Sequence, residues 1–180
     1  MTRSSITIAI ALIALLWSAP LTAQKMTELR KGSGGSAHVR GEWTIDGAHI
    51  SIEYGRPALK GRAEALMMPP GQIGRTGADE QTTLKTDKAL KVGALVVPAG
   101  TYGLHTIPGA TSWQLIVSKR TSGWGIPYPA GEDLGRTPMT VGKAASAAEL
   151  LTFHIDDTPA GATLRLEWGT TSVSVPFSVN

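Results

Sequence analysis

The stretch WTIDGAHISIEY, residues 43–54, decides the fold of this chain. Apolar and polar side chains alternate on both sides of Asp46-Gly47, and a period of two is that of a strand buried on one face. After the turn, one face would hold Ile50, Ile52 and Tyr54 and the other His49, Ser51 and Glu53. Because an Asp-Gly pair between two alternating runs is a strong hairpin signal, the stretch predicts two antiparallel strands.

The same alternation recurs to the end of the chain. The later apolar sets are Tyr102 and Leu104; Trp113, Leu115 and Val117; Leu151, Phe153 and Ile155; Leu164, Leu166 and Trp168; and Val173, Val175 and Phe177. Between them, 21 glycines and 11 prolines in the whole chain act as turn residues. Many short strands with one apolar face predict an all-β fold: an antiparallel β-sandwich, jelly-roll or immunoglobulin-like, in a single domain.

Two windows lack the alternation. Residues 58–74 contain Pro69-Pro70-Gly71 and are interpreted as a loop with room for one helical turn. Residues 122–146 are rich in glycine and proline, and the stretch 142–148 at their end is interpreted as either a short helix or a surface excursion.

The N-terminus has the order of a secretory signal. One positive charge, Arg3, precedes an apolar run over residues 6–17 and then small residues up to Ala23. The alternative to cleavage after Ala23 is an uncleaved membrane anchor. The run of twelve apolar residues disfavours it, because roughly 20 are needed to cross a bilayer. We expect a signal peptide over residues 1–23, a flexible Gly/Ser-rich linker over 24–37 and the domain over 38–180, exported to the periplasm or the extracellular space.

Composition excludes several classes of function. The chain has no cysteine, which removes disulfides, thiol catalysis and thiolate metal sites. Its net charge of +3 is too small to indicate nucleic-acid binding or stable attachment to a membrane. Its four histidines lack the spacing of a metal site, and no nucleotide-binding glycine motif follows a strand, so no metal and no cofactor are expected.

Several segments together match a known family in order and spacing. They are Tyr54-Gly55-Arg56-Pro57, Lys60-Gly61-Arg62, Arg75-Thr76-Gly77-Ala78-Asp79-Glu80, Val97-Pro98-Ala99-Gly100-Thr101-Tyr102-Gly103-Leu104 and Thr106-Ile107-Pro108-Gly109, followed by Trp113. Over roughly residues 38–177 the chain resembles the domain of unknown function 2911 family of secreted bacterial proteins. The resemblance implies a signal peptide and a mostly β domain, and it implies no particular activity.

The chain departs from the family pattern at two positions. The family usually has an aromatic residue where this chain has Gly74, and commonly an asparagine where it has Asp79. An ionised Asp79 cannot donate the hydrogen bond that an asparagine could give to a ligand.

Charged residues of the family segments are the first candidates for a site. Arg56, Arg62 and Arg75 lie in one stretch with Asp79 and Glu80. Arginine suits carboxylate and phosphate oxygens, so the loop could form a polar pocket for a small anionic ligand or a glycan, roofed by the loop over residues 122–130. The alternative is that these charges form structural ion pairs that hold the loop against the strands.

Two further residues complete the candidates. His105 lies on a strand that could be covered on both sides, and Trp124 lies between two glycines, either as a loop anchor or as a platform for a ligand. A binding module is the preferred interpretation. The first alternative is a hydrolase or isomerase with Glu80 or Asp79 as base and His105 as its partner. The second is an envelope scaffold protein that binds a partner through an exposed strand edge. The sequence does not predict an oligomeric state.

Overall fold

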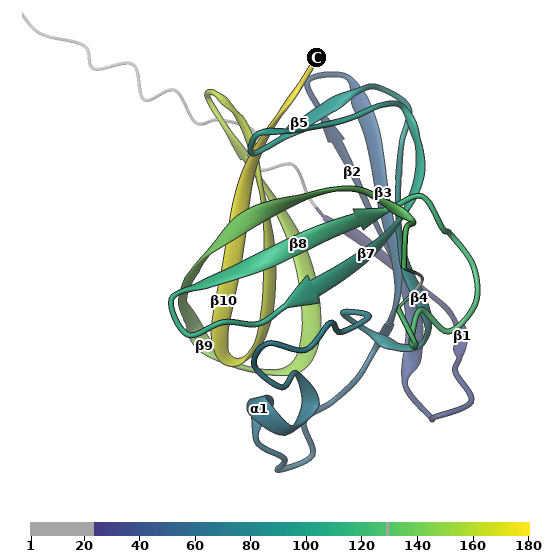
Figure 1. Cartoon of the computed structure of the whole chain (residues 1–180), viewed down its shortest axis with the longest axis vertical. Helices are drawn as coiled ribbons and strands as arrows, with labels where there is room; N and C mark the ends of the chain where they lie inside the picture. Colours follow the sequence, from purple (N-terminus) through teal and green to yellow (C-terminus); the bar gives the residue numbers. More distant parts are fainter. Residues whose placement is uncertain (1–23, 129) are drawn as a thin grey trace, which may run out of the picture.

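Ten antiparallel strands form one continuous sheet in the computed structural model of the chain, which describes residues 24–128 and 130–180 (Figure 1). Their order in the sheet is β1-β2-β3-β4-β7-β8-β9-β10-β5-β6. The elements are β1 Lys25–Lys31, β2 Ala37–Ile45, β3 Ala48–Arg56, α1 Glu64–Met67, β4 Ala78–Thr86, β5 Leu90–Val92, β6 Leu95–Val97, β7 Gly100–Ile107, β8 Ser112–Ser118, β9 Asp133–Thr158 and β10 Gly161–Val179. The expected signal peptide lies outside the described residues.

The predicted hairpin is present as β2 and β3. Trp43 pairs with Ile50 and Ile45 with Ala48, which leaves Asp46 and Gly47 as the two-residue turn. Both turn residues have positive φ, 47° and 73°, as the tight turns that match strand twist require.

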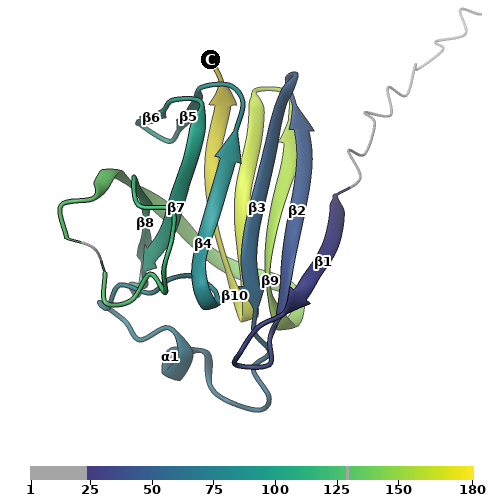
Figure 2. The ribbon, with the colours of Figure 1, turned by 90° about the vertical axis from the view of Figure 1, so that its right-hand side faces the viewer.

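The sheet curls so that β2 and β3 pack against β9 and β10, with the core between these strands (Figure 2). Tyr54 and Phe153 meet there edge to face, with ring centroids 5.0 Å apart, and the Tyr54 hydroxyl accepts a hydrogen bond from the Phe153 amide. The all-β, antiparallel, single-domain prediction is thus confirmed. A single sheet forms both facing parts, because β8, β9 and β10 continue the hydrogen bonding from β7.

The segment 142–148 is not a helix. It belongs to β9, whose pairing with β10 shifts register on both sides of Gly169. Helix propensity of its alanines is outweighed by the main-chain hydrogen bonds that a neighbouring strand offers. The other irregular window does contain one helical turn, α1, as expected.

The expected flexible linker is wrong for most of its length. Residues Lys25–Lys31 form β1 and pair with β2, and Ala37 already belongs to β2. The turn between them is held by Asp79, which accepts hydrogen bonds from the Gly34 amide and the Ser33 hydroxyl. A composition that cannot bury apolar surface gains its order here from the hydrogen bonds of an available sheet edge and of one carboxylate.

Two irregular segments position the candidate sites. The loop from Pro57 to Gly77 is joined to β9 by Leu59 N to Glu149 O, 2.9 Å, and to β7 by Gly74 N to Thr106 O, 2.8 Å. The described residues of the loop 119–132, which are 119–128 and 130–132, lie on the outer face of the sheet, the face turned away from the core, above β4 and β7. Within the described part of the chain, no helix is long and apolar enough to cross a membrane.

Candidate functional site

A pocket of about 270 Å³ lies between the loop 57–77, Ile126 of the loop 119–132, and Leu151 of β9 with Trp168 of β10. We call it the Arg75 pocket. Its wall consists mostly of apolar side chains and main chain, with a single charged residue. The lining residues are Pro57, Met67, Met68, Pro69, Gln72, Ile73, Gly74, Arg75, Gly77, Ala78, Ile126, Leu151 and Trp168.

The backbone of the segment 74–79 is fixed in an uncommon conformation at this pocket. Thr76 and Asp79 both have positive φ, 57° and 61°, which is rare for a β-branched residue such as threonine. The Thr76 hydroxyl lies 3.0 Å from the Thr106 hydroxyl, and both groups are buried. Gly55 lets the segment approach β3, because a Cβ at Gly55 would lie 2.1 Å from the Ala78 carbonyl oxygen. Strain of this kind persists where surrounding contacts over-determine it, as they often do at functional sites.

Arg75 supplies the only charge of the pocket wall. Its Nη1 donates to the Asp79 carbonyl at 2.8 Å and to the Trp124 carbonyl at 3.3 Å. Its guanidinium carbon lies 5.7 Å from the Trp124 ring centroid, a cation–π contact. Among the described residues no partner of its Nε or Nη2 is found, so these donors can serve a ligand.

Asp79 and Glu80 point to the outer face and do not line the Arg75 pocket. Burial alone would raise the pKa of Asp79, but hydrogen bonds from Gly34, His38 and Ser33 outweigh it and hold that pKa below its ordinary value. The hydrogen bond from Arg30, at 2.9 Å, is the main cause that lowers the pKa of Glu80. Both carboxylates are therefore ionised at neutral pH and hold the N-terminal strand to the sheet.

His105 is fully buried and is not paired with Asp79 or Glu80. Its Nε2 lies 3.0 Å from the Gly125 carbonyl, and its ring packs edge to face on Tyr128 with centroids 4.8 Å apart. Burial lowers the pKa of His105, so the ring is neutral, and its Nδ1 is buried without a partner among the described residues. The predicted acid–base pair with Glu80 or Asp79 is thus not formed, and the expectation that both sides of this strand are covered is confirmed.

The histidine that does meet these acids is His38. Its Nε2 lies 3.4 Å from Asp79 Oδ2 and 3.1 Å from Glu80 Oε2. Sequence reasoning missed it because His38 precedes Asp79 by 41 residues, and only the bulged pairing of β3 with β4 places them side by side. No group of histidine and acidic residues that could hold a metal is found within residues 24–128 and 130–180.

The two remaining arginines lie apart from the pocket. Arg56 donates through Nη2 to the Thr152 hydroxyl at 2.8 Å, while its Nε is buried without a partner among the described residues. Arg62 donates to the Leu59 and Ala58 carbonyls, both at 2.8 Å. Of the predicted residues, the structure therefore brings together Arg75, the Asp79 backbone and Trp124, and it separates Arg56, Arg62, Glu80 and His105 from them.

The apolar wall of the pocket was not predicted. Met67, Met68 and Ile73 come from the loop without alternation, where apolar side chains have no strand face to join. Apolar side chains in a segment without strand alternation were therefore the sequence signal that could have indicated this wall. Leu151 and Trp168 gave none, because as members of alternating strands they were expected only in the core.

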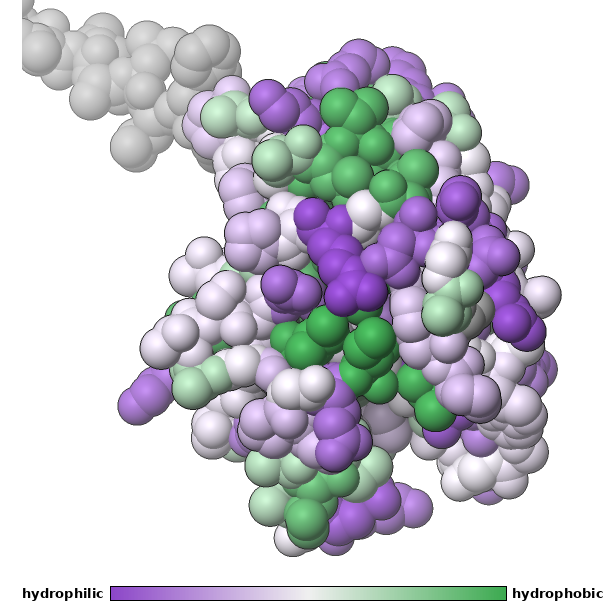
Figure 3. Space-filling model, viewed as in Figure 1, coloured by the Kyte–Doolittle hydropathy of each residue, from purple (hydrophilic) through white to green (hydrophobic). Residues whose placement is uncertain are grey.

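Exposed apolar residues lie near the pocket and elsewhere. On the face seen in Figure 3, apolar side chains gather in two areas, one over β5 and β6 and one between β7 and α1. Trp124 and Ile126, next to the pocket, are 52% and 41% exposed. Residues 122–130 were expected to roof a polar pocket. Of their described members, Ile126 lines the Arg75 pocket and Trp124 lies beside Arg75, and the pocket wall is mostly apolar.

Comparisons with known proteins gave one match. A family model described as "Protein of unknown function (DUF2911)" matches residues 36–177. A search of curated proteins and a search of solved structures found no match.

Proposed function

The chain belongs to the DUF2911 family, and from that premise we propose that its domain is a binding module for a small organic anion with an apolar body, held in the Arg75 pocket. The family description assigns no activity. The proposal therefore rests on the residues of the site.

One observation carries the proposal: an otherwise apolar pocket has a single guanidinium with free donors in its wall. Ligand sites are typically mostly apolar with a few placed polar groups that fix orientation. A carboxylate would pair with Nε and Nη2 of Arg75, which form a planar fork. The apolar body of the ligand would then contact Leu151, Trp168 and Ile126. The volume of about 270 Å³ fits a small acid and not a polymer.

Thermal unfolding with a panel of acids and matched alcohols tests the proposal. Benzoate and hexanoate are compared with benzyl alcohol and hexanol. An acid present at a hundred times its dissociation constant should add about 2.7 kcal/mol of stability, or roughly 5–10 °C in Tm. The alcohols should add much less, since they cannot form an ion pair.

Arg62 provides a matched control for Arg75. Both side chains donate to two backbone carbonyls, but only Arg75 lines the pocket. Arg75→Gln should abolish the shift given by the acids, and Arg62→Gln should leave it intact. Equal shifts from acids and alcohols, or an undiminished shift in Arg75→Gln, would refute anion binding here.

Export is the second part of the proposal. The positive charge, apolar run and small residues before Gln24 support cleavage after Ala23 and a site of action in the periplasm or outside the cell. N-terminal sequencing of the protein from cell fractions tests it. An exported chain that begins at Gln24 is the expected result, and a cytoplasmic chain that begins at Met1 contradicts it. Binding of a partner protein through an exposed strand edge stays a prediction, and the experiments described above do not test it.

A further inference from the structure

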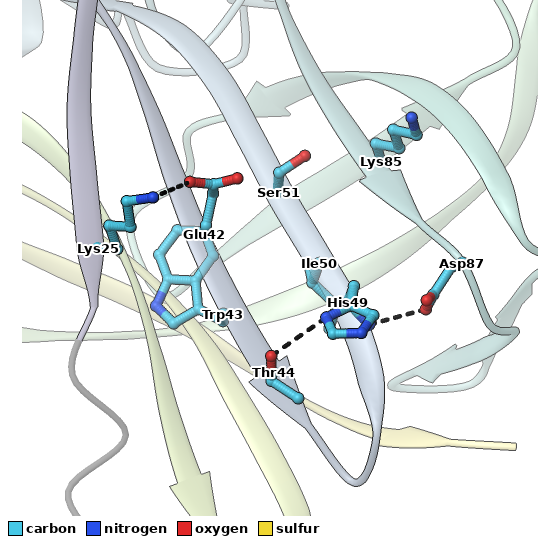
Figure 4. Close-up of a pocket in the computed structure, with 9 residues that line it drawn as sticks. All are labelled: Lys25, Glu42, Trp43, Thr44, His49, Ile50, Ser51, Lys85 and Asp87. Atoms are coloured by element: carbon cyan, nitrogen blue, oxygen red, sulfur yellow. Dashed lines mark hydrogen bonds and ion pairs between the residues drawn. The ribbon is translucent and has the colours of Figure 1, made fainter.

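Two further hollows of the described residues differ in their relation to the Arg75 pocket. One, of about 610 Å³, lies against β1 to β4 and shares no lining residue with that pocket (Figure 4). Within it, Lys25 lies 3.6 Å from Glu42, and Asp87 accepts a hydrogen bond from the His49 amide. Nothing in its wall extends the site described above.

The other hollow adjoins the Arg75 pocket. It has a volume of about 250 Å³ and lies between α1, the turn from β7 to β8, and β10. We call it the second pocket. Its wall is mostly apolar and includes Ala65, Pro70, Pro108 and Trp113. The two pockets have one lining residue in common, Met68, so this residue stands between them.

The main chain of Met68 is fixed on both sides. Its amide donates to the Glu64 carbonyl at 2.9 Å, and the Glu64 carboxylate in turn binds Thr171 of β10. After Met68 come two prolines, whose fixed φ stiffens the segment, and then Gly71, whose amide donates to the Pro108 carbonyl at 2.8 Å. Because the main chain is held, the side chain of Met68, which is buried, closes one pocket from the other.

The direction from Arg75 to the second pocket follows the end of β7. Gly74, the neighbour of Arg75, exchanges hydrogen bonds with Thr106 at 2.8 and 3.0 Å. Gly71 instead donates to Pro108, which lines the second pocket. Two residues of extended chain span about 7 Å. A ligand whose carboxylate pairs with Arg75 can therefore extend its apolar body toward the partition between the pockets.

The second pocket suits an apolar chain end and not a second acid. Its one charged side chain is Glu64. Burial alone would raise the pKa of Glu64, but hydrogen bonds from Thr171 and Thr170 outweigh it and hold that pKa below its ordinary value. The ionised Glu64 repels a carboxylate, whereas the apolar wall gains from each methylene that it covers.

We propose that Met68 determines the length of the acid that the Arg75 pocket accepts, because its side chain ends the space for the apolar body of the ligand. The inference rests on the anion binding proposed above. It narrows the ligand class to carboxylates with a short chain or a single ring. Removal of the side chain beyond Cβ would join the second pocket to the first and nearly double the space.

Isothermal titration calorimetry with butanoate, hexanoate, octanoate, decanoate and dodecanoate tests the inference. In the wild type, affinity should rise by about fourfold per methylene for the shortest acids and then stop rising within the series, because further methylenes reach solvent. In Met68→Ala the rise should continue to a longer acid. Decanoate should then bind at least about tenfold more tightly than it binds to the wild type.

Two controls separate the partition from general loosening of the pocket. Met67 lines the Arg75 pocket but not the second one, so Met67→Ala should leave the length limit unchanged. Decanedioate should gain nothing from Met68→Ala, since its second carboxylate would meet Glu64. Met68→Val removes less of the side chain, and it should move the limit in the same direction if the alanine variant does not fold.

The inference is overturned if the rise in affinity stops at the same acid in the wild type and in the folded Met68 variant. It is also overturned if Met67→Ala extends the rise equally, or if decanedioate gains as much as decanoate. Failure of the anion proposal gives a different result: no acid of any length binds, or Arg75→Gln binds hexanoate as tightly as the wild type does. Met68 then loses its assigned role together with the pocket.

Discussion

Two segments beside the outer face of the sheet are fixed by opposite kinds of interaction. The N-terminal strand β1 pairs with β2, and charges hold it and its turn further: Asp79 binds the turn, and Glu80 binds Arg30 and His38. The loop 119–132 is held over His105, which is neutral and fully buried. The difference teaches that a segment can be held by ionised side chains, as with Asp79 and Glu80, or by packing over a buried neutral side chain, as with His105. Acid and mutation should therefore change the stability of the two segments differently.

Removal of the buried ring should have the largest effect. His105→Ala deletes a fully buried side chain that contacts Gly125 and Tyr128, and it should cost about 3 kcal/mol of unfolding free energy. Urea denaturation measures it. His49→Ala, an exposed histidine on the same face, should change stability by less than about 0.5 kcal/mol. Similar costs for the two variants would mean that the buried ring does not hold the loop.

Removal of the Asp79 carboxylate should have the next largest effect. Asp79→Ala leaves the Gly34 amide, Ser33 and His38 without their acceptor and should cost about 2 kcal/mol. Asp79→Asn keeps an acceptor oxygen and should cost about half as much, because only the charge is lost. Denaturation of both variants, with amide exchange of β1, separates the two contributions. An asparagine variant as unstable as the alanine variant would show that charge, and not geometry, holds the turn.

Acid should release the two segments in different pH ranges. Burial lowers the folded-state pKa of His105, so the stability from its neutral ring is complete above the unfolded pKa of about 6.5 and declines as pH falls below it. The pKa values of Asp79 and Glu80 are also lowered, so their stability is complete above the unfolded values of about 4 and is lost as pH falls through the folded ones.

Unfolding free energy measured from pH 8 to pH 3 checks this order. His105→Gln should flatten part of the decline that begins near pH 6.5 and leave the acidic decline in place. The remainder of the first decline belongs to His154, whose pKa is also lowered, chiefly by burial. Asp79→Asn should affect only the acidic range. Identical pH profiles for the wild type and His105→Gln would contradict the assignment.

The surface ion pair should have the smallest effect. Arg30 and Glu80 are about half exposed, so Arg30→Gln should cost no more than about 0.5–1 kcal/mol, and added salt should reduce that cost. Denaturation at low and high ionic strength measures it. A cost that salt does not change would show that Arg30 acts through packing and not through its charge.

Sequence patterns predict some features of these segments and not others. The strand face that buries Ile50 and Ile52 was predictable, since each side chain's direction follows from its neighbours. The place of β1 was not, because its polar composition is that of a linker and its order depends on β2 and on Asp79. The role of His105 was predictable only in part: its covered face could be inferred from Ile107, but not its contact with Gly125.

The sequence by itself determined the all-β class, the β2–β3 hairpin, the single domain and membership of a family, because period-two alternation and turn residues act over a few neighbouring positions. The tertiary structure alone decided which distant segments meet: Ile126 with Pro57 at the Arg75 pocket, and His38 with Asp79 on the outer face. The physical reason is that strand order, bulges and the curl of the sheet place these side chains, and none of these is encoded in any one local stretch.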